Sequence, residues 1–199
     1  MIFQFSRDGF AAIPIIVVTD GTYPCFLASL TVVFLSNLET DVNEVNNQLV
    51  PTVGTCGVMG TASTMALITE ALGLMISNGA CAPAVSAERR RIAEQTGKIA
   101  VKIASEDLKP SSFLSIKNFQ NALTVLSAVG GSTNGIVHLT AMAGRLGIDI
   151  NLYDFDKMTK DTPMIVDLKP SGSGYMEDLF KSGGLPRVLV NLKKYLHLD

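Results

Sequence analysis

Apolar residues recur every three or four positions in four stretches of the chain, the spacing that places them on one face of an α-helix. The apolar positions, helix by helix, are Met65, Ile68, Leu72 and Met75; Ile92, Ile99 and Ile103; Phe119, Leu123, Leu126 and Val129; and Ile136, Leu139, Met142 and Leu146. The start signals are Ser86, then Pro110 with Ser115, then Ser132 or Thr133, and the stop signals are Gly73, Gly79 and Gly147. We expect four helices, the second with its arginines toward solvent, and shorter ones over 175–181 and 186–196.

Two apolar runs without helical spacing are typical of buried strands. Residues 13–19 are rich in β-branched side chains and end at the turn signal Asp20-Gly21, and residues 164–168 form the second run. Residues 25–38 are apolar without a clear period, so a strand pair and a buried helix both fit them. Strands that alternate with helices predict an α/β fold, with layered helices around a sheet.

The chain divides near residue 50, after the polar, Asn-rich stretch 39–48. We expect a divergent N-terminal strand and linker over 1–50 and the main body over 51–199. With 47% hydrophobic and 17% charged residues among 199, the chain has enough apolar side chains for a core.

Charge and composition exclude several classes of partner. The net charge is -2 and no basic run is longer than residues 89–91, so we expect no nucleic-acid partner. Each apolar run is shorter than the roughly 20 residues that span a bilayer, and we expect no membrane association. Three scattered cysteines do not form a disulfide framework. These features favour the cytoplasm, or an organelle interior in a eukaryote.

Three loops rich in glycine and hydroxyl groups run into predicted helix starts, at 54–63, 130–134 and 170–174. Unpaired N–H groups at a helix start attract anions, and glycine allows a ligand to approach the backbone. The loops therefore suit a polyhydroxylated carboxylate, with helix capping as the simpler alternative. No loop matches a nucleotide-binding fingerprint. The candidate substrate-binding residues are Ser132, Thr133, Asn134, Ser171 and Gly172.

Cys56 lies in the first of these loops, where Gly54, Gly57 and Gly60 leave space around it. The start of a helix favours a thiolate, which is the form that binds metal or attacks a substrate. A small cysteine can also be an inert part of the packing. The residues themselves leave open a metal ligand and a thiol enzyme that uses Cys56 alone.

Five segments together resemble the IlvD/Edd dehydratases, which include dihydroxy-acid dehydratase and the sugar-acid dehydratases. They are GTCGVMGTASTMALITEALGL, APAVSAERRRIAEQTGK, AVGGSTNGIVHLTAMAGRLGIDI, YDFDKMTKDTPMIVDLKPSG and MEDLFKSGGLPRVL. They follow in the order of the family, and the resemblance runs from about residue 51 to 192. Residues 11–22 look like a family strand, and residues 23–48 look shortened or replaced.

The resemblance implies an iron-sulfur hydro-lyase that removes water from a 2,3-dihydroxy carboxylate to give a 2-keto acid, as in branched-chain amino acid biosynthesis. Cys56 would be the last of three cysteines that hold a [2Fe-2S] rather than a [4Fe-4S] cluster, and Mg²⁺ would hold the carboxylate and the 2-hydroxyl group. The partners would be a small dihydroxy acid and further copies of the subunit. The neutral motif around Cys56 resembles the dihydroxy-acid and pentonate branches and differs from the phosphogluconate branch. We expect the branched-chain precursor as substrate, with a pentonate as the alternative.

Several departures from the family pattern qualify that expectation. The other cluster cysteines would precede this chain, and the C-terminal barrel would follow Asp199, so a truncated, inactive remnant or an interaction module is a further alternative. Cys25 and Cys81 stand where the family needs no cysteine. Ser173 replaces the basic residue that usually follows Pro-Ser-Gly.

Three further side chains carry weaker expectations. His138 lies four residues after Asn134, so both can face one pocket, and a catalytic role and a buried core position fit His138 equally well. Lys169 and Arg187 could pair with a carboxylate, although solvated surface charges are commoner.

Overall fold

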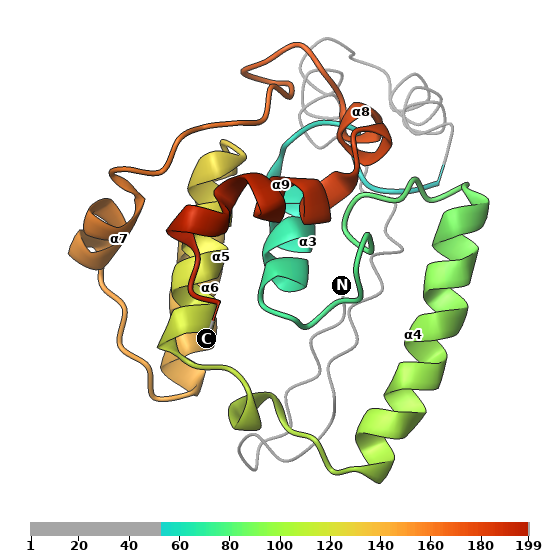
Figure 1. Ribbon diagram of the computed structural model, residues 1–199, viewed down its shortest axis with the longest axis horizontal. Coiled ribbons are helices and arrows are strands. Elements are labelled where there is room, and N and C mark those ends of the chain that lie inside the picture. The colour runs from blue at the N-terminus through green and yellow to red at the C-terminus, as the bar shows by residue number, and fades with distance from the viewer. Residues whose placement is uncertain (1–52, 199) are drawn as a thin grey trace, which may run out of the picture.

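A computed structural model describes residues 53–198, without the side chain of Met158, and its regular elements are helices (Figure 1). In chain order they are α3 Thr61–Ala71, α4 Ala87–Ser105, the 3-10 turn η1 Pro110–Ser112, α5 Ile116–Ala128, α6 Asn134–Arg145, α7 Leu152–Thr159, α8 Met176–Lys181, α9 Gly184–Leu192 and η2 Lys193–Tyr195. The residues described contain no β-strand. This part of the chain is therefore helical, and the predicted sheet is not seen in it.

The four main predicted helices are confirmed, and local caps explain where they begin. The Ser86 hydroxyl accepts a hydrogen bond of 3.1 Å from the backbone N–H of Arg89 and starts α4. Ser115 and Asn118 form a capping box at the start of α5. The first helix ends at Ala71, before the predicted Met75, because Gly73 takes a φ of +80°, which is left-handed and ends the helix.

The predicted strand over residues 164–168 is wrong. Only Leu168 makes a bridge, an isolated one with Gly174, and the backbone N–H of Ile165 bonds the carbonyl of Ala128 at the end of α5. The run lacks a neighbouring strand in the described part, and Met164 is 67% exposed. The predicted strand over 13–19 and the stretch 25–38 lie outside the residues described.

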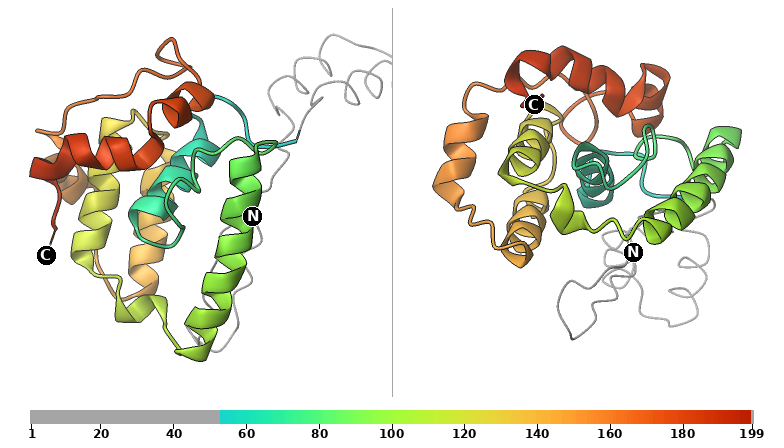
Figure 2. Two further views of the ribbon diagram at one scale, coloured as in Figure 1. Left: turned by 45° about the vertical axis from the view of Figure 1, so that its right-hand side comes forward. Right: turned by 60° about the horizontal axis from the view of Figure 1, so that its bottom comes forward.

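Helix α3 lies at the centre of the fold and packs against α5, α6 and α9 (Figure 2). Every residue from Ser63 to Thr69 is buried. One side of α3 contacts a cluster built with α5, α8 and α9, where Leu67, Val125 and Leu185 are fully buried. The other side contacts a cluster built with α5 and α6, which includes Ile68, Phe119 and Leu139. The central helix therefore joins the two cores.

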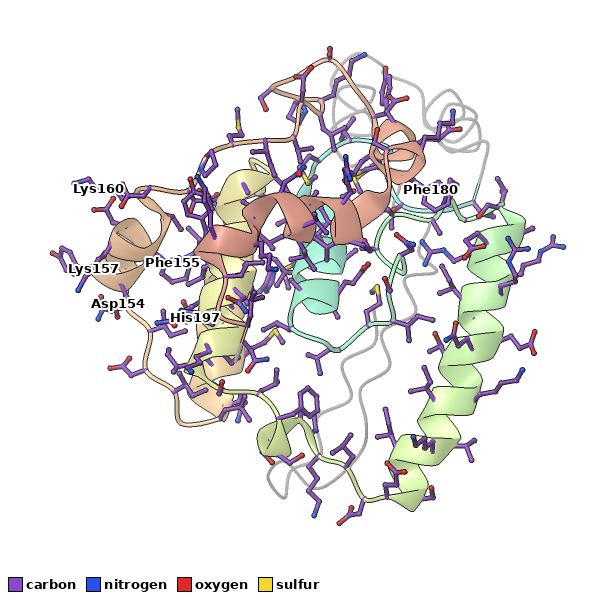
Figure 3. The ribbon with its side chains drawn as sticks, in the orientation of Figure 1. Asp154, Phe155, Lys157, Lys160, Phe180 and His197 are labelled. Carbon is purple, nitrogen blue, oxygen red and sulfur yellow. The ribbon has the colours of Figure 1, made fainter. Side chains whose placement is uncertain are left out.

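Two outer elements complete the arrangement. Helix α7 packs on α5 through Phe155, while Asp154 and Lys157 lie on its outer side (Figure 3). The sequence pattern did not predict α7, because Phe155 is its one buried side chain among those described. Helix α4 stands to one side, with only Ile92 and Thr96 buried.

The end of the described chain is fixed to α5. The side chain of Asn121 donates to the carbonyl of His197 and accepts from its backbone N–H, each over 2.8 Å. This pairing holds the segment after η2 against the bundle, and His197 is labelled there in Figure 3. Among residues 53–198, none of the helices combines the length and the apolar character needed to cross a membrane.

Candidate functional site

The loop that carries Cys56 leads directly into α3, and Cys56 is exposed on it. Inside this loop the Ser63 hydroxyl donates to the Val58 carbonyl over 2.8 Å and thereby closes the loop onto the first turn of α3. Gly60 faces the thiol, since a Cβ built on Gly60 would lie 3.7 Å from the Cys56 sulfur. The thiol is thus accessible on a loop that the helix start holds in place.

Thr61 joins this loop to the second predicted loop, residues 130–134. Its hydroxyl oxygen accepts a hydrogen bond of 2.8 Å from the side-chain amide of Asn134 and lies 3.1 Å from the Ser132 hydroxyl. One turn further along α3, the Thr64 hydroxyl accepts from the backbone N–H of Ser132 over 2.9 Å. Two side chains of α3 therefore fix the loop that begins α6.

Backbone hydrogen bonds join the Cys56 loop to the third predicted loop. The N–H of Met59 donates to the Lys169 carbonyl over 2.7 Å, and the N–H of Met176 donates to the Gly57 carbonyl over 2.8 Å. The segment 169–176 is therefore anchored at both ends on the two residues that flank Val58. The second and third glycine-rich loops therefore both contact the Cys56 loop, although the three loops are up to about a hundred residues apart in sequence.

Asp167 shapes the third loop. Its carboxylate accepts hydrogen bonds from the Ser173 hydroxyl over 2.5 Å and from the Ser173 backbone N–H over 3.1 Å. A Cβ on Gly172 would overlap the same carboxylate, so the turn requires glycine there. The Ser173 hydroxyl and backbone N–H are consequently engaged inside their own loop.

Some of the candidate residues predicted from the sequence contact Thr61, and the others do not. Ser132 and Asn134 join Thr61 within hydrogen-bonding distance. Thr133 occupies the N-cap position of α6 without a side-chain cap bond, and Ser171 is exposed. His138 is exposed on α6, so the alternative of a buried core histidine is wrong.

The second loop also lines a cavity of about 380 Å³ between α5, α6 and α7. Its lining residues are Leu126, Ser127, Gly130, Gly131, Ser132, Thr133, Ile136, Phe155, Asp156 and Thr159. Cys56 is not among them. No residue of the Cys56 loop lines the cavity, and the 130–134 loop contributes to the cavity lining and also contacts Thr61.

Cys81 is a different kind of cysteine. It is 4% exposed, and burial, followed by the nearby Glu70 carboxylate, raises the pKa of its thiol to about 12. A thiol with that pKa stays protonated at neutral pH and is a poor metal ligand.

Glu70 and Arg89 hold the loop between α3 and α4. The Glu70 carboxylate accepts from the backbone N–H groups of Asn78 and Ala80 over 2.8 and 2.9 Å, and burial raises its pKa. The Arg89 guanidinium donates to the carbonyls of Gly79 and Ala82. The prediction that the arginines of α4 face solvent is therefore wrong for Arg89.

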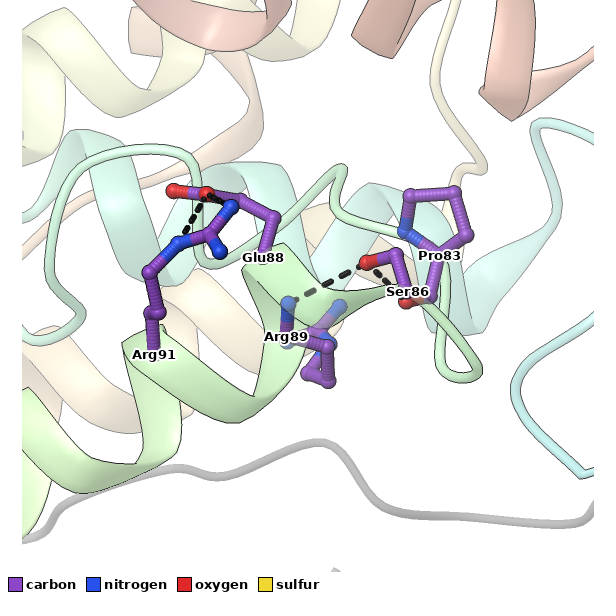
Figure 4. A network of polar contacts seen from close by, with 5 residues as sticks. All are labelled: Pro83, Ser86, Glu88, Arg89 and Arg91. Atoms are coloured by element: carbon purple, nitrogen blue, oxygen red, sulfur yellow. Dashed lines mark hydrogen bonds and ion pairs between the residues drawn. The ribbon is translucent and has the colours of Figure 1, made fainter.

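Figure 4 shows the start of α4 around that arginine. Ser86 donates its hydroxyl to the Pro83 carbonyl over 2.7 Å while it accepts the backbone N–H of Arg89, and Arg91 pairs with Glu88 on the exposed side. The polar network thus has an exposed ion pair and a half-buried part that orders the loop before α4.

Among the described side chains, Cys56 fits the role of a single ligand of a metal cluster. In the described part of the chain, no three His, Cys, Asp or Glu side chains lie close enough together to hold a metal ion. Cys56 is exposed, glycines surround it, and the other described cysteine is buried elsewhere. The described residues can therefore contribute a single thiolate to a shared centre, with room around it.

Two contacts of this site have no signal in the sequence pattern: Thr61 joins two loops, and Lys169 contacts Tyr175. Thr61 lies inside the Cys56 motif and is the first residue of α3, and its partners Ser132 and Asn134 are more than seventy residues away in the sequence. Lys169 precedes the third loop, and its ammonium lies against Tyr175, which no local pattern indicates.

The chain matches the family described as dihydroxy-acid/6-phosphogluconate dehydratase N-terminal over residues 12–199. The IlvD1 protein of Rhizobium meliloti, which is named as a dehydratase, is 47% identical over 146 residues, 73% of this chain and 25% of that protein. The dihydroxy-acid dehydratase of Metallosphaera sedula is 41% identical over 161 residues, 80% of this chain and 29% of the relative. That of Sulfurisphaera tokodaii is 43% identical over 159 residues, 80% and 28% of the two chains.

This chain therefore belongs to the dihydroxy-acid/6-phosphogluconate dehydratase family, within its N-terminal domain. It spans between a quarter and three tenths of the length of these relatives. The resemblance read from the sequence motifs is confirmed.

Proposed function

We propose that this chain forms part of a dehydratase that converts a 2,3-dihydroxy carboxylate into a 2-keto acid and water. The observation that supports this most directly is the meeting of three glycine- and hydroxyl-rich loops around the exposed Cys56. In the reaction, the C2 proton and the 3-hydroxyl group leave as water, and the resulting enol becomes the 2-keto acid. The branched-chain precursor is the proposed substrate.

Residues of this chain would bind and orient the acid. Ser132 and Asn134, held by Thr61, would face the hydroxyl groups, and Ser171 and Gly172 would offer backbone and hydroxyl donors from the third loop. Thr133 would add a hydroxyl group at the start of α6. His138 lies one turn along the same helix and would be the candidate to move a proton.

Cys56 would provide one thiolate ligand for an iron-sulfur cluster, which we propose to be of the [2Fe-2S] type. When bound, the cluster supplies a Lewis acid for the departing hydroxyl group, and Mg²⁺ neutralises charge on the carboxylate. Further ligands would come from outside the described residues. The complete enzyme is proposed to be a cytoplasmic homo-oligomer.

A hybrid enzyme tests this proposal. Residues 53–198 replace the matching segment of the Metallosphaera sedula dihydroxy-acid dehydratase, and 2-keto acid formation is measured with 2,3-dihydroxy-3-methylbutanoate and with a pentonate. We expect activity with the branched acid, and its loss in Cys56→Ser together with the visible absorbance of the cluster. Cys81→Ser is the matched control and should retain both.

Each other outcome points to a different function. Activity with the pentonate alone would favour the sugar-acid alternative. A folded hybrid that is inactive with both acids would favour the inactive remnant or interaction module. Full activity in Cys56→Ser would exclude Cys56 as a cluster ligand.

A further inference from the structure

Lys169 differs in its partner from the four described lysines that form ion pairs. Like Lys194, whose ammonium lies 4.8 Å from the centre of the Tyr195 ring, it contacts a tyrosine ring. Four lysines form ion pairs with neighbouring carboxylates: Lys98 with Glu94, Lys102 with Glu106, Lys109 with Asp107, and Lys181 with Glu177. No described carboxylate pairs with Lys169. Its ammonium instead donates to the Tyr175 hydroxyl over 2.5 Å and lies 4.2 Å from the centre of that ring. The phenol orients the charge without cancelling it.

The backbone fixes this ammonium beside the Cys56 loop. The Lys169 carbonyl accepts from Met59, and its N–H donates to the Gly174 carbonyl over 2.8 Å, so its main chain is held on both sides. The Tyr175 ring lies against the same loop, since a Cβ on Gly57 would be 3.8 Å from it. Tyr175 is thus next to Gly57, the residue that follows Cys56, and the Lys169 backbone is next to Met59.

We propose that Lys169, oriented by Tyr175, binds the carboxylate of the acid that reaches the Cys56 loop. An ammonium has three N–H donors, and the Tyr175 hydroxyl uses one of them, which leaves two for carboxylate oxygens. Lys169 is a binding residue in this arrangement and Tyr175 a positioning residue. The identity of the acid rests on the proposed function above.

This assignment also accounts for Ser173. In the resemblance described above a basic residue usually follows Pro-Ser-Gly, but here the Ser173 hydroxyl donates its proton to Asp167 and has none left to donate to a carboxylate. Lys169 lies at the start of the turn that contains Ser173, and its ammonium gives this loop a positive charge. The charge needed for an acid ligand therefore remains, at a different position.

Kinetics of the hybrid enzyme give the first test. Lys169→Met should raise KM for the dihydroxy acid about 10- to 100-fold with little change in kcat, because a charge-assisted hydrogen bond to the bound acid is lost. Lys169→Arg should restore most of the affinity, and Tyr175→Phe should raise KM by a smaller factor. Lys181→Met removes the same charge from a lysine that already has a carboxylate partner, and KM should not change. An unaltered KM in Lys169→Met overturns the proposal.

Binding to the 199-residue chain gives a second test that does not depend on turnover. The probes are 2,3-dihydroxy-3-methylbutanoate and its neutral amide, and the measurement is the NMR shift of the Lys169 ε-methylene group, assigned by its absence in Lys169→Met. The acid should shift this resonance and the amide should not. Equal responses to both probes, or none to the acid, overturn the proposal even if the hybrid is active. Failure of the dehydratase proposal appears separately, as absence of keto acid.

Discussion

The side-chain amide of Asn134 donates to the hydroxyl oxygen of Thr61 over 2.8 Å and so ties the first residue of α6 to the first residue of α3. These residues are 73 positions apart in the sequence. The contact fixes how the 130–134 loop lies relative to the loop with Cys56. It is a tertiary contact between two helix starts, and its contribution can be measured directly.

A double-mutant cycle measures this contact. Thr61→Val and Asn134→Ala should each lower the free energy of unfolding, and the double variant should lose less than the sum of the two, with a coupling of about 0.5–1.5 kcal/mol. Urea unfolding of the four proteins gives the value. Asn121→Ala, which breaks a different contact at His197, should add to Thr61→Val without coupling. Additivity in the Thr61 and Asn134 cycle would contradict the contact.

Two glycines of α6 should respond in opposite directions to alanine. A Cβ on Gly135 would lie 2.8 Å from Leu126 Cδ1 and 3.0 Å from Ile68 Cδ1, so Gly135→Ala should destabilise the fold by about 1–3 kcal/mol through overpacking. A Cβ on Gly144 would have no atom within 4 Å, so Gly144→Ala should stabilise the helix by up to about 1 kcal/mol. Thermal unfolding compares them. Equal effects would mean that α6 does not approach α3 as described.

The two described cysteines should differ in their rate of alkylation. Cys56 is exposed, whereas Cys81 is 4% exposed and has a pKa of about 12, so iodoacetamide at neutral pH should modify Cys56 first. Mass spectrometry of the digested protein identifies the modified peptide. Repetition in denaturant is the control, because both thiols should then react. Equal rates in the folded chain would contradict the burial of Cys81.

Helices with an apolar stripe could be predicted from the sequence, and the remaining elements show why others could not. Phe119 and Leu123 mark the buried face of α5, and a cap begins it. Helix α7 has one buried side chain among those described, Phe155, so no repeat of apolar positions predicts it. The capping box of Asn151 and Asp154 is the local signal of its start. Residues 164–168 have the composition of a strand, but a strand also needs a neighbour, which composition does not reveal.

For the candidate site, the composition of the loops indicated the segments but not their arrangement. Ser132 and Asn134 stood out because glycine and hydroxyl groups precede a helix. Their contacts with Thr61, and the contact of Lys169 with Met59, join segments far apart in the chain, and no local pattern specifies such pairs. Arg89 was misplaced for the same reason, since its carbonyl partners lie in the preceding loop.

Glu70 should give the stability of the fold a measurable pH dependence. Burial raises the folded-state pKa of Glu70 above its ordinary value of 4.5, although hydrogen bonds from Ala80 and Asn78 oppose the shift. The folded state therefore holds the proton more tightly than the unfolded state, so this contribution to stability is fully present below pH 4.5 and is lost as pH rises through the folded pKa.

Glu70→Gln removes this titration. The glutamine amide can accept only one of the two backbone N–H groups, which should cost about 1 kcal/mol at every pH. The unfolding free energy of the natural chain should therefore exceed that of the variant most at low pH, and the gap should narrow as pH rises above 4.5. Glu94→Gln, which removes an exposed carboxylate paired with Lys98, is the control for general charge effects. A gap that widens with pH would mean that hydrogen bonding outweighs burial at Glu70.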